Sequence, residues 1–276
     1  MANALEKDSS AITQALARRG FKILFFNSST GLLIPAIGDE RAVDDYYQYL
    51  KKYSFRLFLR DVIRFKDGAQ LGDLVRYCSA ATARRYLKLL VQWSLIEQTG
   101  RQTYRIIQQG VRSFGDMFEW LVAQILIREF HCPAVWGIRM KDIGAGGDYD
   151  VLSIVEGALL YVEAKSSPPK HVDQREIAAF FDRIEALRPQ CSIFLEDTHL
   201  RMKDKIAELF KEELCRRASN SRAPLPAVER LTGDTHHISD SIFIINSKPD
   251  IVARLGLCIS HFLRSRGIRL CSSAIK

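Results

Sequence analysis

The chain lacks the features of membrane and secreted proteins. No apolar run approaches about 18 residues, and the first ten residues contain two acids but no apolar stretch of the kind that directs secretion. The six cysteines form no C-x-x-C pair and show no zinc-ligand spacing, so we expect free buried thiols in a reducing compartment. These absences predict a soluble, cytoplasmic protein with no membrane partner.

Acidic residues are in the minority, with 32 Asp and Glu against 40 Lys and Arg, which gives a formal net charge of +8. This balance favours a polyanionic partner without identifying it. The length of 276 residues predicts two domains, and the 47% of hydrophobic residues suffices to build buried cores.

The most informative pattern is an acidic β-hairpin. Two short runs rich in Val, Leu and Ile flank Glu156-Gly157, which predicts two strands joined by a tight turn. Side chains alternate along a strand, so Glu163 and Lys165 share one face, and the same rule places Asp148 and Asp150 on a common face of the preceding strand. We therefore expect Asp150, Glu163 and Lys165 to converge on one point.

These residue types suit phosphodiester hydrolysis. The reaction needs a hard cation that neutralises phosphate charge and lowers the pKa of an attacking water. Mg²⁺ typically uses one or two protein carboxylates, a number that Asp150 and Glu163 match, with Mn²⁺ as a substitute ion. Lys165 would orient the water or stabilise the negative charge of the transition state. The alternative is a structural Glu-Lys pair on an edge strand, because a Glu-x-Lys triplet arises by chance about once in a chain of this length.

The same residues resemble the PD-(D/E)XK nuclease superfamily, in particular its Mrr-like and archaeal resolvase-like members. The matching elements are Asp150 within Gly-Asp-Tyr-Asp-Val, the tripeptide Glu163-Ala164-Lys165, and an upstream Phe-Glu-Trp-Leu-Val-Ala segment that begins at Phe118. That segment is similar to the helix F-E-x-x-V-A of the superfamily, which implies that Glu119 lies near the metal. The resemblance covers roughly residues 112 to 200. The proline of the superfamily name is absent, since Tyr149 precedes the aspartate.

The order of predicted elements agrees with the resemblance. A helix capped at Ser113 and running to Phe130 precedes the acidic strands, a helix from Val172 to Leu187 follows them, and a strand covers Cys191 to Leu195. The fold class is therefore α/β, with a restriction-endonuclease-like α-β-β-β-α-β core in a nuclease domain of residues 111–276. Beyond the core we expect a helix over 200–217, an exposed loop over 218–240, a strand over 241–246 and a helix over 251–264.

Residues 55–110 are typical of a winged helix-turn-helix domain. Helices are predicted over 55–65, 71–77 and 80–93, followed by two strands around a glycine turn over 95–106. Residues 80–112 contain six basic residues against one acid, Glu97, a local charge of +5. The third helix and the wing expose the candidate DNA contacts, which are Thr82, Arg84, Arg85, Lys88, Arg101 and Arg105. The alternative is a module for dimerisation or domain packing.

The two ends of the chain are less informative. For residues 1–54 we expect a helix over 12–19, a hairpin of 21–26 with 32–37 and a helix over 44–52, without an assignable role. No acid follows Asp250, whereas Arg254, Arg264, Arg266, Arg269 and Lys276 do, so this end is a candidate groove for nucleic acid. Gln174 is a candidate helper of the active site, but a surface position is the favoured interpretation. His236-His237 has no third ligand in the sequence pattern and is expected to bind no metal.

Taken together, the residues predict a Mg²⁺-dependent DNA endonuclease in which a winged helix positions the DNA, and the resemblance to the superfamily implies a role in restriction, repair or recombination. RNA is an alternative substrate, because the metal chemistry is indifferent to the sugar. A homodimer is one arrangement that would cut both strands of a duplex. The rival hypothesis is a non-catalytic DNA-binding regulator whose second domain serves dimerisation or effector binding.

Overall fold

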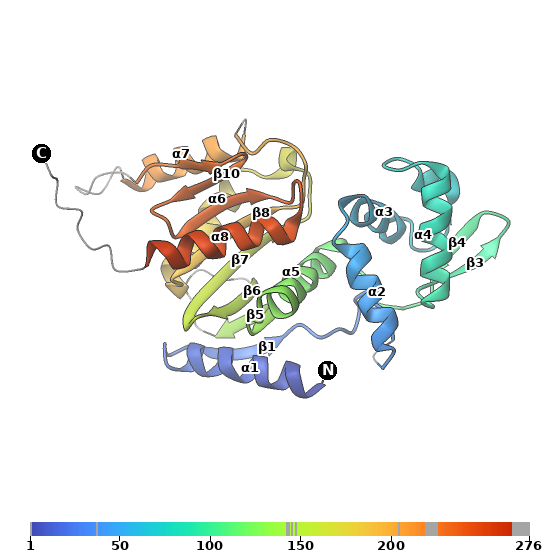
Figure 1. Cartoon of the computed structure of the whole chain (residues 1–276), viewed down its shortest axis with the longest axis horizontal. Helices are drawn as coiled ribbons and strands as arrows, with labels where there is room; N and C mark the ends of the chain where they lie inside the picture. Colours follow the sequence, from blue (N-terminus) through green and yellow to red (C-terminus); the bar gives the residue numbers. More distant parts are fainter. Residues whose placement is uncertain are drawn as a thin grey trace, which may run out of the picture.

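The strands of the protein assemble into two sheets, one large and one small (Figure 1). The computed structural model describes residues 2–36, 38–141, 144, 146, 148–203, 205–218 and 226–266, with the backbone alone for residues 2–9. An eight-stranded mixed sheet has the order β1-β5-β6-β7-β8-β11-β10-β9, and a three-stranded sheet has the order β2-β4-β3. The strands are β1 Lys22–Phe26, β2 Ala69–Gln70, β3 Ile96–Gly100, β4 Thr103–Ile106, β5 Ala134–Lys141, β6 Asp148–Val155, β7 Ala158–Lys165, β8 Cys191–Glu196, β9 Glu229–Thr232, β10 Thr235–Ile238 and β11 Ile242–Asn246.

Helices cover both faces of the large sheet, so the protein has a mixed α/β fold. The α-helices are α1 Ala2–Ala17, α2 Glu40–Leu50, α3 Tyr53–Arg64, α4 Ala80–Gln92, α5 Phe114–Phe130, α6 Gln174–Leu187, α7 Ile206–Ala218 and α8 Ile251–Ser265. Apolar side chains of α1, α6 and α7 pack on one face of the sheet, and those of α5 and α8 pack on the other. Within the described residues, no helix is both long and apolar enough to cross a membrane.

The central hairpin agrees with its prediction. Strands β6 and β7 pair antiparallel, with Val151 opposite Val162 and Val155 opposite Ala158. Glu156 and Gly157 form the turn, both with positive φ angles of 44° and 76°. The predicted order helix, three strands, helix, strand is also observed, as α5, β5, β6, β7, α6 and β8. Strand β8 runs parallel to β7, which brings the carboxyl ends of the two strands to one edge of the sheet.

The predicted hairpin of residues 21–26 with 32–37 is wrong. β1 instead pairs antiparallel with β5, with Lys22 opposite Lys141 and Phe26 opposite Ile138. Residues 32–36 form no strand, and Ile37 lies outside the described residues. Helix α1 is longer than the predicted helix over 12–19. Its Ile12 is fully buried among residues of the large sheet, so this first part of the chain completes that sheet.

Gly137 makes the contact between β1 and β5 possible. Its φ angle is +56°, a left-handed conformation, and its carbonyl oxygen accepts a hydrogen bond from the backbone N–H of Asn27 at 2.9 Å. A Cβ atom at this position would lie 2.6 Å from the Cβ and 2.0 Å from the Nδ2 of Asn27. Only glycine satisfies both the backbone angle and this close approach.

We expect Gly137→Ala to destabilise the protein by about 3 kcal/mol or more, because left-handed strain and a steric clash add together. Gly157→Ala is the matched control. Gly157 also has a positive φ, yet nothing lies within 4 Å of an added Cβ, so only the backbone cost of about 1–2 kcal/mol applies. Urea unfolding monitored by circular dichroism measures both variants. Equal losses for the two would contradict the role assigned to the Asn27 contact.

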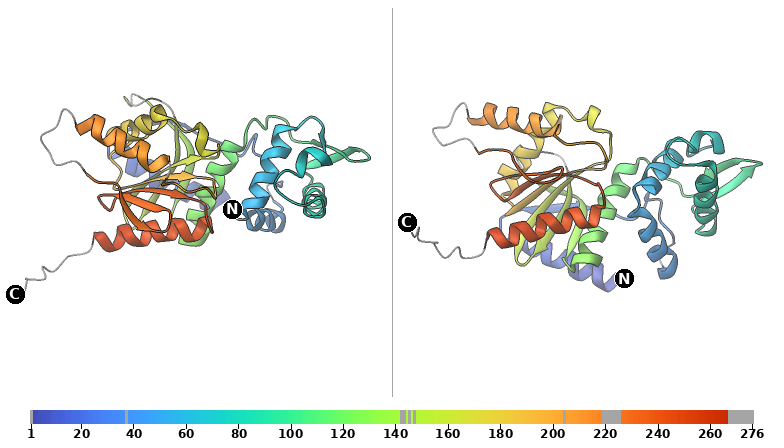
Figure 2. Two further views of the ribbon diagram at one scale, coloured as in Figure 1. Left: turned by 90° about the horizontal axis from the view of Figure 1, so that it is seen from above. Right: turned by 45° about the horizontal axis from the view of Figure 1, so that its top comes forward.

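The small sheet and helices α2 to α4 lie together at one end of the large sheet (Figure 2). Helices α3 and α4 and strands β3 and β4 occupy the ranges predicted for them, whereas the helix predicted over 71–77 is a 3₁₀ turn of Leu71–Leu74. Ser79 caps α4 as expected, since its side chain accepts the N–H of Thr82 at 3.2 Å. The core of this unit is aromatic, and the ring of Phe55 packs edge-on against Tyr86 and Trp93.

The loop predicted over 218–240 is also wrong in part. β9 and β10 pair antiparallel within these residues and extend the large sheet, while residues 219–225 lie outside the described part. His236 and His237 therefore lie on a buried strand and not on a loop. Helix α7 begins at Ile206, later than the predicted helix over 200–217. Strand β11 and helix α8 match their predicted ranges closely.

A buried ion pair joins the small unit to the large sheet. The guanidinium of Arg56 on α3 is fully buried and lies 2.8 Å from Asp197 Oδ1 through Nη2, with Nε 3.0 Å from the same oxygen. Its Nη1 donates to the backbone carbonyl oxygens of Leu50 and Lys51, each at 2.8 Å. The backbone N–H of Asp197 in turn donates to the carbonyl of Lys165 at 2.8 Å. The ion pair between the two units is therefore one backbone hydrogen bond away from Lys165, the last residue of β7.

Candidate active site

The candidate site forms where β6 and β7 separate. Their backbone pairing ends at Val151 and Val162, and beyond that point Oδ2 of Asp150 accepts the backbone N–H of Ala164 at 2.8 Å. The carboxylate thus takes the place of a backbone acceptor in the ladder. This bond fixes one oxygen of Asp150 against β7, close to the residues that follow on that strand.

Glu163 is the most firmly held acid of the site. It is 1% exposed. Its two carboxylate oxygens lie 3.1 and 3.0 Å from Nη1 of Arg183 on α6, and Nζ of Lys165 lies 2.9 Å from Oε1. The hydroxyl of Tyr161 donates to Oε2. A buried carboxylate needs such partners, and two cations and a hydroxyl supply them here.

Lys165 lies between two carboxylates. Its Nζ is 2.9 Å from Glu163 and 3.1 Å from Oε1 of Glu176 on α6, and its side chain is 20% exposed. Burial alone would lower the pKa of Lys165, but the negative charges of Glu163, Asp150 and Glu176 outweigh burial and hold this pKa above its usual value. The lysine is therefore a fixed positive charge at neutral pH, with one side open to solvent.

Asp150 and Glu119 are two further acids whose pKa values are raised by their surroundings. Burial, and then the charge of Glu163, raise the pKa of Asp150, although the N–H of Ala164 and the charge of Lys165 act in the opposite direction. Burial, and then the charge of Asp150, raise the pKa of Glu119 on α5. The structure thus brings Asp150, Glu163, Lys165 and Glu119 into one neighbourhood, as predicted.

Simple alternation along β6 is interrupted between Asp148 and Val151, and Asp148 and Asp150 have different partners. Tyr149 packs in the core beneath α6, whereas Val151, two residues later, packs in the core beneath α5. The alternation is therefore broken at Asp150. Asp148 instead forms an exposed ion pair with Arg139 on β5, with Nη2 2.9 Å from Oδ2. Gly147, also part of the motif, lies outside the described residues.

The sequence reasoning missed Glu176, Arg183 and Glu196. Glu196 ends β8 opposite Lys165, is fully buried, and neither of its carboxylate oxygens has a hydrogen-bond partner in the described part of the chain. Burial, then the charges of Glu176 and Asp197, raise its pKa to about 9. A charged residue at the end of an apolar strand was the available signal, and Glu163 and Lys165 carry the same signal at the end of β7.

We expect Glu196→Gln to remove a pH-dependent loss of stability. The raised pKa means that the folded protein keeps a proton that the unfolded chain has already lost between the ordinary pKa of 4.5 and about 9. The free energy of unfolding therefore falls as pH rises through this window, and the amide cannot titrate. Urea unfolding in EDTA at several pH values checks this result. The variant should gain stability relative to wild type as pH increases, and a constant difference would contradict the expectation.

The predicted nucleic-acid contacts fall into two groups. Arg84, Arg85 and Lys88 are exposed on α4 and Arg101 on the β3–β4 turn, and none of them has an ion pair among the described residues. Thr82 is half-buried and is hydrogen-bonded to Ser79, and Arg105 pairs with Glu97 across β3 and β4, with Nε 3.0 Å from Oε1. The first group is therefore available to a ligand, while the second already has partners.

The remaining predicted residues have other roles or lie elsewhere. Gln174 is not a free surface residue, because its Nε2 donates to the carbonyl of Leu209 at 3.2 Å and to Glu213 at 3.1 Å, joining α6 to α7. Arg254 donates to the backbone of Lys248 and to Thr235. Two of the other carboxy-terminal basic residues, Arg269 and Lys276, lie outside the described residues, as does Cys271. Cys191 and Cys258 are buried thiols.

Comparison with solved structures shows a mixed α/β fold with a large sheet. One similar structure is that of Can2 from Sulfobacillus thermosulfidooxidans in complex with cyclic tetra-adenylate, at a TM-score of 0.51 and 15% identity, covering 90% of this chain and 60% of Can2. Another is the crystal structure of protein VC1899 from Vibrio cholerae, at a TM-score of 0.45 and 15% identity, covering 89% and 58%. The chain spans about three fifths of the length of these proteins. No protein-family model and no curated protein matches the sequence.

Proposed function

We propose that the protein is a metal-dependent nuclease with a restriction-endonuclease-like core and a winged helix that positions DNA. The observation that carries the proposal is the group of Asp150, Glu163 and Lys165 at the point where β6 and β7 separate. The order of core elements from α5 to β8 supports the same proposal. So does the broken alternation at Asp150, which turns its carboxylate toward β7 and away from the regular pattern of the strand.

The donor set fits a hard divalent cation. Asp150 and Glu163 offer oxygen atoms only, which are the ligands that Mg²⁺ and Mn²⁺ prefer. Burial, and then repulsion from neighbouring carboxylates, raise the pKa values of Asp150 and Glu119, and a cation beside these acids would favour their ionised forms. When bound, the ion supplies charge neutralisation at the phosphate and a lower pKa for an attacking water.

The side chains around the acids have distinct tasks in this proposal. Lys165 keeps its proton, so it acts as a charge that holds the attacking water or the non-bridging phosphate oxygens, and not as a base. Arg183 and Tyr161 hold the carboxylate of Glu163 in place through hydrogen bonds. Glu119 reaches the same site from α5 and adds a third carboxyl group. Each task follows from a contact or charge within the described residues.

The small unit supplies the proposed DNA contacts. In α4, Ser79 caps a helix with three exposed cations on one side, and β3 and β4 form the wing beside it. A helix of this kind enters the major groove, and a basic wing touches the backbone or the minor groove. The ion pair of Arg56 with Asp197 connects this unit to the end of β8, next to the candidate site. A second copy of the chain would supply the second cut in a duplex.

A cleavage assay tests the proposal. Purified protein is incubated with supercoiled, linear and branched DNA and with RNA, in Mg²⁺, in Mn²⁺ or in EDTA. Cleavage that needs the divalent ion supports the nuclease and identifies its substrate, including the case of RNA. Binding of DNA without cleavage of any substrate in either ion would overturn the nuclease and favour the non-catalytic regulator.

We expect the double variant Arg84→Ala/Arg85→Ala to weaken DNA binding uniformly across sequences. Each lost phosphate contact should reduce the slope of log K against log salt concentration by about 1. Arg105→Ala is the matched control, because Arg105 is already paired with Glu97 and should change affinity less. Fluorescence anisotropy with labelled duplexes at several salt concentrations provides the measurement. An unchanged slope in the double variant would exclude α4 as a phosphate-binding helix.

A further inference from the structure

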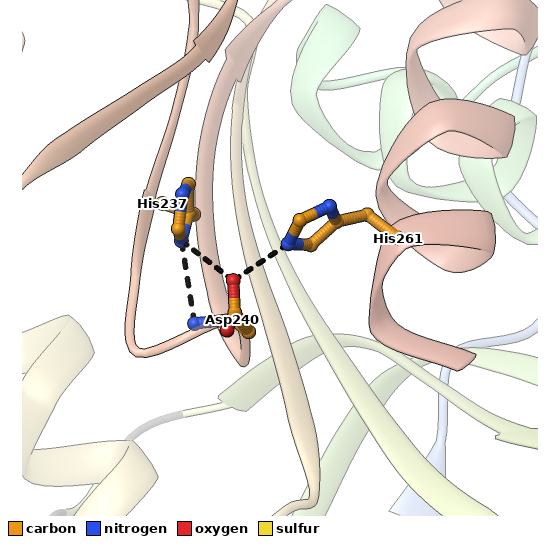
Figure 3. A group of neighbouring side chains, drawn as sticks. All are labelled: His237, Asp240 and His261. Atoms are coloured by element: carbon orange, nitrogen blue, oxygen red, sulfur yellow. Dashed lines mark hydrogen bonds and ion pairs between the residues drawn. The ribbon is translucent and has the colours of Figure 1, made fainter. Parts of the chain in front are cut away.

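Three side chains with metal-binding atoms meet at the turn between β10 and β11 (Figure 3). His237 lies on β10, Asp240 lies in the turn, and His261 comes from α8. Nε2 of His261 is 2.6 Å from Oδ1 of Asp240, and Nδ1 of His237 is 3.2 Å from the same oxygen. All three ligand atoms lie within 4.8 Å of one another. Sequence analysis found only two adjacent histidines here and no third ligand.

The local fold brings these groups together from three separate segments. Ser239 and Asp240 have left-handed φ angles of 50° and 55° in the three-residue turn between the paired residues Ile238 and Ile242, and the backbone N–H of Ser241 donates to the carbonyl of Ile238 at 3.2 Å. Aspartate tolerates this left-handed conformation better than most residues. His261 lies on the face of α8 that packs on the sheet, with its ring 5.8 Å from the ring of Phe243 on β11. Both the turn and the helix therefore direct their side chains to one place.

Nδ1 of His237 cannot serve both of its close neighbours by hydrogen bonding. Nδ1 of His237 accepts the backbone N–H of Asp240 at 3.3 Å and also lies 3.2 Å from the carboxylate oxygen of the same residue. A ring nitrogen carries either a lone pair or a proton, so it cannot accept from the amide and donate to the carboxylate at the same time. A cation resolves the conflict, because the lone pairs of the nitrogen and of the oxygen can both point at it.

We propose that His237, Asp240 and His261 bind one divalent transition-metal ion of the zinc class. Two imidazole nitrogens and one carboxylate oxygen are a donor set that suits Zn²⁺, whereas Mg²⁺ prefers oxygen ligands alone. Three protein ligands leave a fourth position for water. The side chains of His237, Asp240 and His261 are 11%, 33% and 28% exposed, so an ion can enter from one open side.

This site is separate from the candidate active site and does not depend on the proposed nuclease function. Strand β11 begins at Ile242, which pairs with Ser192, and ends at Asn246, which pairs with Glu196 beside the acids. Four residues of strand separate the two ends by roughly 13 Å. The ion would fasten the β10–β11 turn to α8 and so stabilise the half of the sheet that holds Glu196.

A Co²⁺ titration of the full chain tests the site. All proteins carry Asp150→Asn, which weakens ion binding at the other acids. We expect this background to bind Co²⁺ with the visible absorption of a tetrahedral complex, and the further change His261→Ala to reduce the affinity by at least about 100-fold. His131→Asn is the matched control, because His131 is an exposed histidine at the left-handed end of α5. Added Zn²⁺ should raise the melting temperature of the background and of the control, but not of the His261 variant.

The outcomes separate the proposal from a purely structural cluster. Equal Co²⁺ affinity in the background and in the His261 variant would overturn the site, and so would the absence of any Co²⁺ binding in the background. If His261→Ala does not fold, as judged by circular dichroism, Asp240→Asn decides. Asparagine also accepts the left-handed backbone of the turn but removes the charged ligand, so unchanged affinity in that variant would overturn the proposal.

Discussion

Asp150→Asn is expected to abolish cleavage and, at the same time, to make the metal-free protein more stable. The asparagine side-chain oxygen can still accept the N–H of Ala164, so the separation of β6 from β7 is preserved. The charge that would hold the cation is lost. Because metal assistance is worth several kcal/mol, the cleavage rate should fall at least about 1,000-fold.

The gain in stability follows from the raised pKa of Asp150 in the folded protein. Between its ordinary pKa and the raised value, the unfolded chain is ionised while the folded protein keeps a proton, so the free energy of unfolding falls as pH rises. Asparagine does not titrate, so this decrease in the free energy of unfolding is absent from the variant. The expected gain in EDTA at pH 8 is on the order of 1 kcal/mol or more.

Two measurements decide this prediction together. Initial cleavage rates in Mg²⁺ give the first effect, and urea unfolding in EDTA at pH 5 and pH 8 gives the second. The stability gained by Asp150→Asn over wild type should be larger at pH 8 than at pH 5. Full cleavage activity in the variant would remove Asp150 from the site, and a loss of stability at pH 8 would show that its carboxylate is not strained. Gln174→Ala, a variant of a residue that joins α6 to α7, controls for general effects of substitution.

Arg56→Met is expected to destabilise the protein by about 3–5 kcal/mol, because it leaves Asp197 buried without its main partner. Arg56 is fully buried, and it also donates two hydrogen bonds to the end of α2 and its cap. Since the backbone N–H of Asp197 donates to the carbonyl of Lys165, cleavage should decrease as well.

Arg60→Met is the matched control for this prediction. Nη2 of Arg60 lies 3.5 Å from the same carboxylate and has no hydrogen-bond partner among the described residues, so the loss of this contact should cost less than the loss of Arg56. The double variant Arg56→Met/Asp197→Asn should lose less stability than Arg56→Met alone, because the buried charge is gone. Thermal and urea unfolding measure all three. Equal effects of Arg56→Met and Arg60→Met would contradict the central place given to Arg56.

The sequence predicts well what depends on neighbouring residues. The hairpin of β6 and β7 follows from alternation and from a two-residue turn, and the start of α4 follows from the cap at Ser79. In both cases the interactions that decide the structure span only a few residues. The convergence of Asp150, Glu163 and Lys165 belongs to the same class, since one hairpin carries all three.

Contacts between distant segments account for the errors. β1 pairs with β5, whose residues lie more than a hundred positions later in the sequence, and no local pattern distinguishes this partner from the segment over 32–37. β9 and β10 are rich in polar residues, so their composition predicts a loop. They form strands because they pair with each other and with β11 at the edge of the large sheet. The pairing of Arg56 with Asp197 joins residues 141 positions apart, and the sequence contains no signal for it.

The pairing of β1 with β5 also determines how the two units are connected. The chain leaves the large sheet after Phe26, builds the small unit, and returns to the large sheet at α5 (Figure 1). The small unit is thus an insertion with two covalent attachments, whereas a domain at a chain end would have one. A domain joined by a single linker can rotate about that linker, whereas two attachments restrict the rotation of the small unit. In the proposed nuclease, the architecture itself would then set the distance between the DNA bound by the small unit and the phosphate that is cleaved.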